Sequence, residues 1–537
     1  MDTHARARRE RNTVRLRVAS STSLRALPRL PHSLSMCRPL HANDAIGQRA
    51  AALFCCSVLA AVTVGGADSA PTTRDTCSDA LQSACGAQCH PHSPTCTFRC
   101  AACAGQHQQQ LSAAGCDNNG ITAWCAGVAP PPPPGLHLNP MQRVLLRESK
   151  AIDGSPALYY LGRNASSTKY VIWLEGGGIC QSLADCQNRA KGSLGSSRRS
   201  LPVQNVGQGM MLADRAANPD FYEWNRVYVP YVSGDVWGGA APQPLNPFLD
   251  KGDGSKELMP TGTVGFFQGH LIVEEVLSSL KQASGLADAT EVILTGCSAG
   301  GIGAITNCDY VADTLTAFRK ADRGDAAVGP RVSCRPEAGW FGLPINDYAH
   351  FSAGTVMADL RHLRSSNWTY HINPWTPRSP EGQSCAADVA AGKKSVSNCN
   401  GQLHGPVDCC GVPTVLFDYV RTPIYISENT ADQYQVQAQG GMPSVTGPEE
   451  ARYIDYLRGI LAGSLTTQVV NGARKSQNGL FAPACFKHCM DWNSGPTVGG
   501  RNHAQAFGDW YFKRGRSPAM SLNNDTDAAN IVQCKND

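Results

Sequence analysis

Short apolar runs alternate with amphipathic segments along most of the chain from about residue 139 onward. The apolar runs are rich in β-branched and aromatic residues, and they predict buried strands at 169–177, 226–234, 291–296 and 421–429. Apolar residues at helical spacing predict helices at 269–282, 300–318 and 451–463. Because strands alternate with helices, the pattern predicts an α/β fold with a mostly parallel sheet and helices on both faces.

The N-terminal region has a different pattern. An apolar run of 15 residues, 50–64, follows Arg49 and precedes the small residues at 65–67. A membrane span needs roughly 20 apolar residues, so we expect a cleaved signal peptide within a leader at 1–67 rather than stable membrane insertion. An uncleaved signal anchor is the alternative, and initiation at Met36 instead of Met1 would give a signal peptide of ordinary proportions.

Cysteine usage indicates an oxidising compartment, since the chain has 23 cysteines and eight of them fall within 77–125. Few large apolar residues accompany those eight, so we predict a small disulfide-rich module at 77–125. A proline-rich linker at 129–138 separates it from a main domain at 139–537. Three N-x-S/T sequons also fit a secreted, extracellular or cell-wall protein: Asn164, Asn367 and Asn524.

The charge pattern argues against a nucleic-acid partner. The formal net charge is +4, but residues 1–67 hold ten arginines against three acidic residues. The remainder is therefore mildly acidic, and it offers no basic stripe for a phosphate backbone.

The candidate chemistry begins with a G-x-S-x-G sequence at 296–300, whose serine is Ser298. The serine lies between a predicted strand and a predicted helix, which is the context of a nucleophile elbow. A tight strand-to-helix turn needs small neighbours, and the helix that follows points backbone N–H groups at the site. A glycine-rich turn with an incidental serine is the alternative.

An esterase serine also needs backbone donors for the oxyanion of the tetrahedral intermediate. Three consecutive glycines, at 176–178, stand at the end of the predicted strand at 169–177, and they let the backbone approach a substrate closely. We assign these donors to the amides of Gly177, Gly178 and Ala299. A phosphate-binding nest or a plain turn is the alternative interpretation.

The remaining triad residues should follow the serine in the order acid, then histidine. Asp432 comes just after the predicted strand at 421–429, where an acid at the top of the sheet belongs. His488 lies between Cys485 and Cys489, so disulfides could hold its loop. His503 is the rival base and Asp347 the rival acid, and position alone does not choose among them.

Six motifs in this order resemble the pectin acetylesterase family, which includes the Notum carboxylesterases. They are WLEGGGIC, NPDFYEWNRVYVPYVSGDVW, LTGCSAGGIGA, CRPEAGWF, FAPACFKHC and AFGDWYF, spread over roughly 139–518. The resemblance implies an α/β-hydrolase-like fold, a Ser298, Asp432 and His488 triad, and a mechanism without metal or organic cofactor. The short spacings of Cys180 with Cys186 and of Cys485 with Cys489 suggest local disulfides.

These patterns lead to a secreted serine carboxylesterase that removes O-acetyl groups from a polysaccharide such as pectin, through an acyl-enzyme. The alternative substrate for the same machinery is a fatty-acyl ester of a protein. A third hypothesis is that the chain is an inactive, glycan-binding homologue. The predicted partners are therefore an acylated polysaccharide or an acylated protein.

Overall fold

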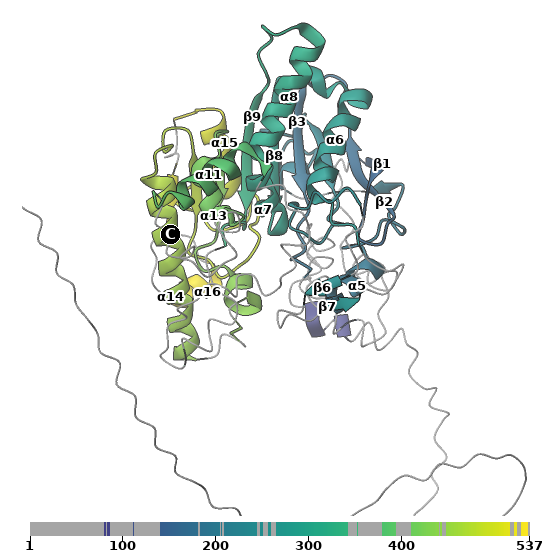
Figure 1. Cartoon of the computed structure of the whole chain (residues 1–537). Helices are drawn as coiled ribbons and strands as arrows, with labels where there is room; N and C mark the ends of the chain where they lie inside the picture. The colour runs from purple at the N-terminus through teal and green to yellow at the C-terminus, as the bar shows by residue number, and fades with distance from the viewer. Residues whose placement is uncertain are drawn as a thin grey trace, which may run out of the picture. The chain divides into compact units, whose positions relative to one another are not determined.

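Figure 1 shows a computed structural model of the chain. The structure describes residues 140–180, 183–204, 206, 209–243, 248–250, 256–258, 265–341, 378–393, 410–439, 441–442, 447–515, 520–523 and 528–534, with isolated helical residues at 80–81, 83–85, 111 and 352. The chain divides into two units, Met1–Asp68 and Ser69–Asp537, and all the described residues belong to the second. The predicted leader, most of the cysteine-rich module and the proline-rich linker lie outside the described residues.

The described residues form one large sheet of ten strands and a separate ribbon of two. In sheet order the strands are β12 (Met520–Leu522), β11 (Gly479–Ala482), β10 (Tyr425–Ser427), β9 (Arg331–Glu337), β8 (Glu291–Cys297), β3 (Lys169–Leu174), β5 (Asn225–Val229), β2 (Pro156–Gly162), β1 (Met141–Lys150) and β4 (Val203–Gln204). Neighbours from β12 to β5 are parallel, and the last three pairings are antiparallel. The ribbon pairs β6 (Phe248–Asp250) with β7 (Lys256–Leu258).

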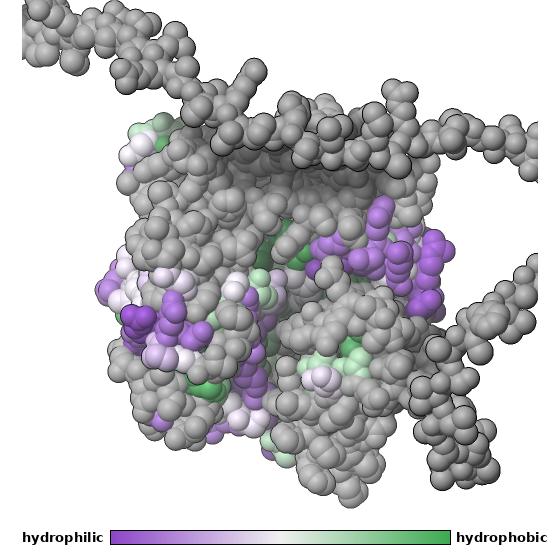
Figure 2. Space-filling model, turned by 90° about the horizontal axis from the view of Figure 1, so that it is seen from below, coloured by the Kyte–Doolittle hydropathy of each residue, from purple (hydrophilic) through white to green (hydrophobic). Residues whose placement is uncertain are grey.

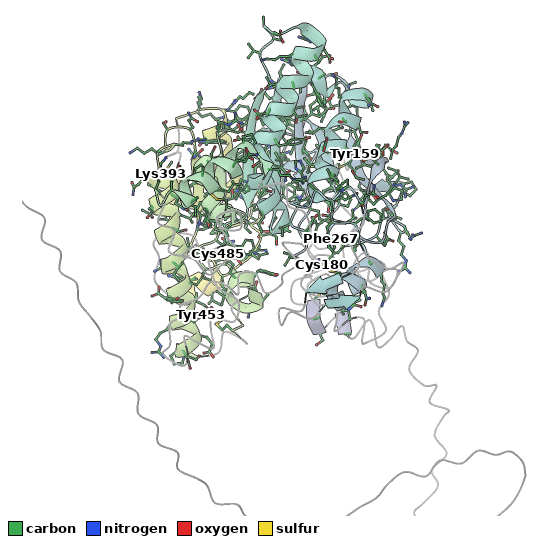
Figure 3. All side chains as sticks on the ribbon, in the orientation of Figure 1. Tyr159, Cys180, Phe267, Lys393, Tyr453 and Cys485 are labelled. Carbon is green, nitrogen blue, oxygen red and sulfur yellow. A yellow bond between two sulfur atoms is a disulfide. The ribbon has the colours of Figure 1, made fainter. Side chains whose placement is uncertain are left out.

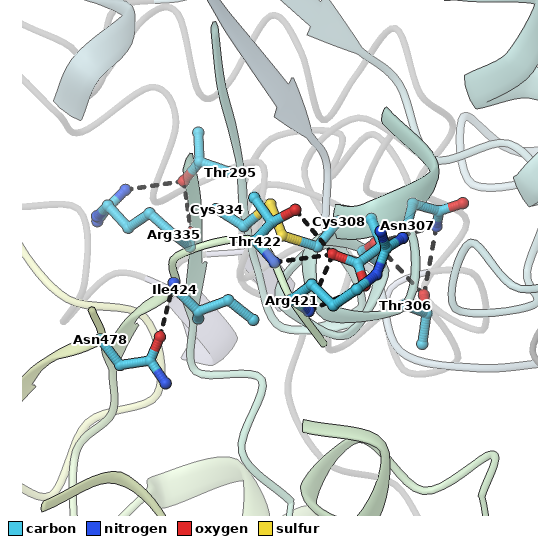
Figure 4. The surroundings of a disulfide bond; sticks show 12 residues. Thr295, Thr306, Asn307, Cys308, Cys334, Arg335, Arg421, Thr422, Ile424 and Asn478 are labelled. Carbon is cyan, nitrogen blue, oxygen red and sulfur yellow. Dashed lines mark hydrogen bonds and ion pairs between the residues drawn. A yellow bond between two sulfur atoms is a disulfide. The ribbon is translucent and has the colours of Figure 1, made fainter. Parts of the chain in front are cut away.

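Helices cover both faces of this sheet. The α-helices are α5 (Leu183–Lys191), α6 (Gly269–Ser284), α7 (Ala299–Thr306), α8 (Cys308–Arg323), α11 (Pro380–Ala390), α13 (Pro413–Leu416), α14 (Pro448–Leu465), α15 (His503–Tyr511) and α16 (Ala528–Gln533). Two successive residues of β9 contact different helices. Cys334 is bridged to Cys308 of α8, and Arg335 contacts His503 of α15. Because neighbouring strand residues point to opposite faces, α8 and α15 lie on opposite sides. Figure 4 shows the α8 side of this arrangement.

The central strands are buried, which explains their nearly continuous apolar sequences. Tyr170–Leu174 in β3 and Val292–Cys297 in β8 are buried throughout. The strand β3 pairs with β5 on one side and with β8 on the other, so the connections diverge there. In such sheets the site lies beyond the carboxyl ends of the strands at this switch point. Those ends face the lower side of Figure 1, where α7 begins, and Figure 2 views this side, with hydrophobic residues visible in hollows of the surface.

The predicted α/β fold is confirmed, with differences in detail. The predicted strands contain β3 and β10 and overlap β5 and β8, each of which extends one residue beyond its predicted range. The helices predicted at 269–282 and 451–463 lie within α6 and α14. The single helix predicted at 300–318 is instead two helices that meet at Asn307. The buried Asn307 side chain donates to the Trp237 carbonyl and accepts from His270, and these bonds hold the junction.

Five disulfides connect described cysteines: Cys180–Cys186, Cys297–Cys489, Cys308–Cys334, Cys385–Cys410 and Cys485–Cys534. The suggested local pair Cys180–Cys186 is confirmed. The suggested pair Cys485–Cys489 is wrong, because each of these cysteines bridges to a distant segment. Figure 3 labels Cys180 and Cys485.

Candidate active site

Ser298 occupies a strained turn between β8 and α7. Its φ of 61° and ψ of −124° are rare for a residue with a side chain, and its amide donates to the Glu337 carbonyl at 2.9 Å. A Cβ at Gly300 would lie 2.0 Å from the Leu174 carbonyl oxygen, so only glycine lets α7 start this close to β3. The sequence after β8 therefore folds into a sharp elbow, which is the kind of turn that presents a nucleophile in α/β-hydrolase-like folds.

The glycine segment after β3 lies directly against this elbow, since a Cβ on Gly176 would be 3.0 Å from Ser298 Cβ. Arg189 of α5 donates to the carbonyls of Gly177 at 2.7 Å and Ile179 at 3.1 Å. In a trans peptide the C=O and the next N–H point in opposite directions. The Gly178 N–H is therefore turned away from Arg189.

The N–H groups of Gly177, Gly178 and Ala299 have no hydrogen-bond acceptor in the part of the chain that the structure describes. Space at Gly177 is also restricted, because a Cβ there would lie 2.6 Å from Leu194 and 2.7 Å from Tyr231. Unpaired amides beside an elbow serine are the arrangement that stabilises an oxyanion.

A network after β5 supports the glycine segment from behind. The buried Asp235 carboxylate accepts from the amides of Trp237 at 3.1 Å and Gly269 at 2.8 Å, which joins this loop to the start of α6. Burial raises the pKa of Asp235 above its ordinary value. Trp237 in turn donates its indole N–H to the Glu175 carbonyl at 3.0 Å.

His488 and Asp432 form a direct pair, although 56 residues separate them in the sequence. The imidazole Nδ1 donates to Asp432 Oδ2 at 2.7 Å, and the amide of Gln435 donates to Asp432 Oδ1 at 2.9 Å. Asp432 is completely buried and His488 is 8% exposed. His488 Nε2 is buried without a hydrogen-bond partner among the described residues, so its lone pair is free to accept a proton.

The Cys297–Cys489 disulfide brings this histidine to the elbow. Cys297 precedes Ser298 and Cys489 follows His488, and their Cα atoms are 6.0 Å apart. A ring nitrogen of His488 lies within 4.8 Å of both sulfur atoms. These three residues have the composition of a metal site, but the sulfurs are joined and offer no thiolates.

No hydrogen bond between Ser298 Oγ and His488 Nε2 is present among the described residues. Catalytic hydrogen bonds are often long in a free enzyme and shorten when substrate binds. The structure thus brings the predicted serine, histidine, acid and amides to one edge of the sheet.

Two aromatic residues that the sequence reasoning missed enclose the histidine. The Tyr434 ring stacks on His488 with centroids 5.0 Å apart, and the Phe341 ring lies edge-on at 6.2 Å. The Tyr434 hydroxyl is 3.5 Å from where a Gly178 Cβ would stand, so this side chain spans from the histidine to the glycine segment. Burial raises the pKa of Tyr434. Tyr434 lies only two residues after Asp432 in the sequence, and this proximity was the one signal that could have placed Tyr434 at the site.

The rival base His503 has a different position. Its Nε2 lies 2.8 Å from Ser427 Oγ and 3.0 Å from an Arg335 nitrogen, and its ring stacks on Phe481. Burial, and then the Arg335 charge, holds the pKa of His503 well below its ordinary value. A residue bonded in this way is part of the core. The rival acid Asp347 lies outside the described residues.

A family model described as pectinacetylesterase matches residues 137–530. The chain belongs to the pectinacetylesterase family. The match spans the sheet, the Ser298 elbow and the loop that carries His488. Membership in this family supports a carboxylesterase. In the described residues, no helix has the length and apolar character needed to cross a membrane.

Individual members of the pectinacetylesterase family resemble the chain over most of this domain. Pectin acetylesterase 5 of Arabidopsis thaliana is 28% identical over 392 residues, covering 68% of this chain and 78% of the relative. Palmitoleoyl-protein carboxylesterase NOTUM of Mus musculus is 27% identical over 342 residues, covering 63% and 57%. The solved structure of the Wnt deacylase Notum from Drosophila has the same fold, with a TM-score of 0.55, 23% identity, and coverage of 72% of this chain and 97% of that one.

Proposed function

We propose that the chain is a serine carboxylesterase that removes O-acetyl groups from a polysaccharide, with Ser298 as nucleophile, His488 as base and Asp432 as acid. The observation that carries the proposal is the His488–Asp432 hydrogen bond, held beside the Ser298 elbow by the Cys297–Cys489 disulfide. Family membership supports ester hydrolysis, and relatives named pectin acetylesterases support an acetylated polysaccharide as substrate.

The proposed acylation step uses the free Nε2 of His488. His488 takes the Ser298 hydroxyl proton, and Ser298 Oγ forms a bond to the ester carbonyl carbon. Asp432 holds the Nδ1–H tautomer and stabilises the imidazolium. The amides of Gly177, Gly178 and Ala299 bind the oxyanion, and each such donor is typically worth about 10²- to 10³-fold in turnover.

Collapse of the tetrahedral intermediate breaks the bond to the sugar oxygen, which leaves with the proton held by His488. Water then repeats the sequence on the acetyl-serine, with His488 again as base, and acetate is released. The complete cycle consumes one ester bond and one water molecule, and it needs no other reactant.

The aromatic rings of Tyr434 and Phe341 beside His488 favour a short acyl group. Tyr434 spans from the histidine ring to Gly178, so it limits the space where the acyl chain would extend from the oxyanion. The likeness to palmitoleoyl-protein carboxylesterase NOTUM favours the second candidate, a long acyl chain on a protein. That substrate would require a deep apolar channel beside Ser298.

Labelling with a fluorophosphonate probe tests the nucleophile. We expect wild type to be labelled and Ser298→Ala to lose both labelling and ester hydrolysis, while Ser464→Ala, a serine on α14 whose Oγ accepts from the Trp340 indole, retains both. Unchanged hydrolysis by Ser298→Ala would exclude the proposed mechanism.

Substrates with short and long acyl groups test which acyl group the enzyme prefers. Acetylated pectin, a palmitoleoylated peptide, and p-nitrophenyl acetate and octanoate are compared by kcat/KM. The proposal predicts preference for the acetyl esters. Turnover of only the octanoate and the palmitoleoylated peptide would instead establish the fatty-acyl alternative.

A further inference from the structure

Three buried carboxyl groups gather at the carboxyl ends of β9 and β10, and only one of them, Asp432, has a role in the mechanism above. Glu337, Glu428 and Asp432 are each at most 3% exposed. Glu337 is paired with Arg335 at 2.5 Å, and Asp432 is paired with His488 at 2.7 Å. Glu428 has no cationic partner among the described residues.

The contacts of Glu428 account for both of its oxygens and join it to the triad. Its Oε2 accepts the Trp340 amide at 3.0 Å, and its Oε1 is 3.4 Å from the Gln435 side-chain nitrogen. Gln435 bridges the two carboxyl groups, because its backbone amide also donates to Asp432 Oδ1 at 2.9 Å. Two carboxyl groups can share a hydrogen bond only when one of them carries a proton.

Electrostatics assign the proton to Glu428. Burial without a counter-ion, then the Asp432 charge beside it and the more distant Glu337 charge, raise the pKa of Glu428 well above its ordinary value. Asp432 is the partner that keeps a negative charge, because it faces the Nδ1–H of His488. A buried carboxylic acid kept neutral as a donor has precedents in other active sites.

We infer that Glu428 is a positioning residue of the triad, a neutral carboxylic acid that donates its O–H to the Asp432 carboxylate and fixes that carboxylate against His488. The inference rests on the proposed function, since it concerns the same serine hydrolase site. Three donors then hold Asp432: the Gln435 amide, the imidazole and the Glu428 hydroxyl. Glu428 acts through Asp432 and does not reach the substrate.

A pH dependence follows from this arrangement. At pH values below the raised pKa, Glu428 is protonated and its hydrogen bond is present. As pH rises through that pKa, the donor becomes an anion in contact with Asp432, and the two groups repel. The groups facing Glu428 are Asp432 and Gln435 of its own loop, Glu337 with its Arg335 on β9, and the Trp340 amide. We expect kcat/KM of the wild type to fall at high pH for this reason.

Two substitutions of Glu428 separate donation from mere packing. Glu428→Gln keeps an N–H donor that cannot ionise, so kcat/KM at neutral pH should stay within about threefold and the alkaline fall should disappear. Glu428→Met is similar in length without a donor, and its kcat should drop by at least about tenfold with little change in KM. Glu381→Gln is the matched control, because burial also raises the pKa of Glu381, on α11, and its profile should match wild type.

The rates are measured as acetate release from a soluble acetyl ester, within the pH range where each variant stays folded. Infrared difference spectra should show the band of a protonated carboxylic acid in wild type that Glu428→Gln lacks. An unchanged alkaline fall in Glu428→Gln, or equal rates for the Gln and Met variants, would refute the inference. If wild type hydrolysed no ester at all, the proposed function itself would fail.

Discussion

Removing the Cys297–Cys489 disulfide should damage activity more than its effect on stability explains. The bridge joins residues adjacent to Ser298 and His488 and closes a loop with a sequence separation of 192. Chain-entropy arguments assign such a loop about 5 kcal/mol of stability. The Cys308–Cys334 bridge, with a separation of 26, should contribute about 3.5 kcal/mol by the same relation.

The two double variants, Cys297→Ala with Cys489→Ala and Cys308→Ala with Cys334→Ala, form a matched pair. Both remove a bridge of the folded domain, but the second bridge joins α8 to β9 away from the catalytic groups. Without the first bridge, the histidine loop is held beside the elbow only by hydrogen bonds and packing. A displacement of about 1 Å in such a site can cost about 10²-fold in rate.

We therefore expect the Cys297/Cys489 variant to lose at least about tenfold in kcat per folded molecule, and the Cys308/Cys334 variant to stay within about twofold. Urea unfolding followed by tryptophan fluorescence gives the stability loss and the folded fraction, and initial rates in the absence of urea give kcat. Equal values of kcat per folded molecule in the two variants would refute a positioning role for the bridge.

The remaining predictions concern the oxyanion segment, the acyl site and the core. Arg189→Met should lower kcat by about 10²-fold in ester assays, because the Gly177 carbonyl loses its donor, whereas Asp185→Asn should retain activity; equal losses would contradict this. Tyr434→Ala should raise the octanoate-to-acetate ratio of kcat/KM by about tenfold, and an unchanged ratio would mean that this ring does not bound the acyl site. Burial lowers the pKa of His270 from 6.5 to about 4, so the stability present above pH 6.5 is lost as pH falls towards 4. At a pH of about 4.5 the loss should be about 2.5 kcal/mol, and in urea titrations His270→Gln should remove that part of the pH dependence.

The sequence predicted the structure best in short segments where a single physical requirement restricts the residue types. A buried parallel strand needs a continuous apolar run, so β3 and β8 could be predicted from hydropathy alone. The elbow could be predicted because its tight turn requires small residues around Ser298. β9 was missed, because its sequence RVSCRPE carries Arg335 and Glu337, and the ion pair that lets these two charges be buried could not be read from the sequence.

Long-range partners could not be read from the sequence. The spacing of Cys485 and Cys489 suggested a local bridge, yet each pairs with a cysteine in a distant element. Neither α5 nor a role for Arg189 was predicted, because the contact of Arg189 with the glycine segment depends on how α5 packs. Glu428 gave no signal either, since its neighbours come from β9 and from the turn of its own loop.

The proposed function places the chemistry and the choice of substrate in different parts of this molecule. The groups proposed to act on the ester come from the ends of strands that lie close together in the sheet: the glycine segment after β3, Ser298 after the adjacent β8, and Asp432 after β10, which is separated from β8 by β9 alone. Strand pairing fixes their spacing, and a disulfide adds the histidine loop, so loops elsewhere can change without disturbing them. One family can therefore contain both proteins named pectin acetylesterases and proteins named palmitoleoyl-protein carboxylesterases. The residues that decide between such substrates should be those that line the acyl path without holding the triad, and Tyr434, which reaches from the histidine ring to the glycine segment, is the first to test.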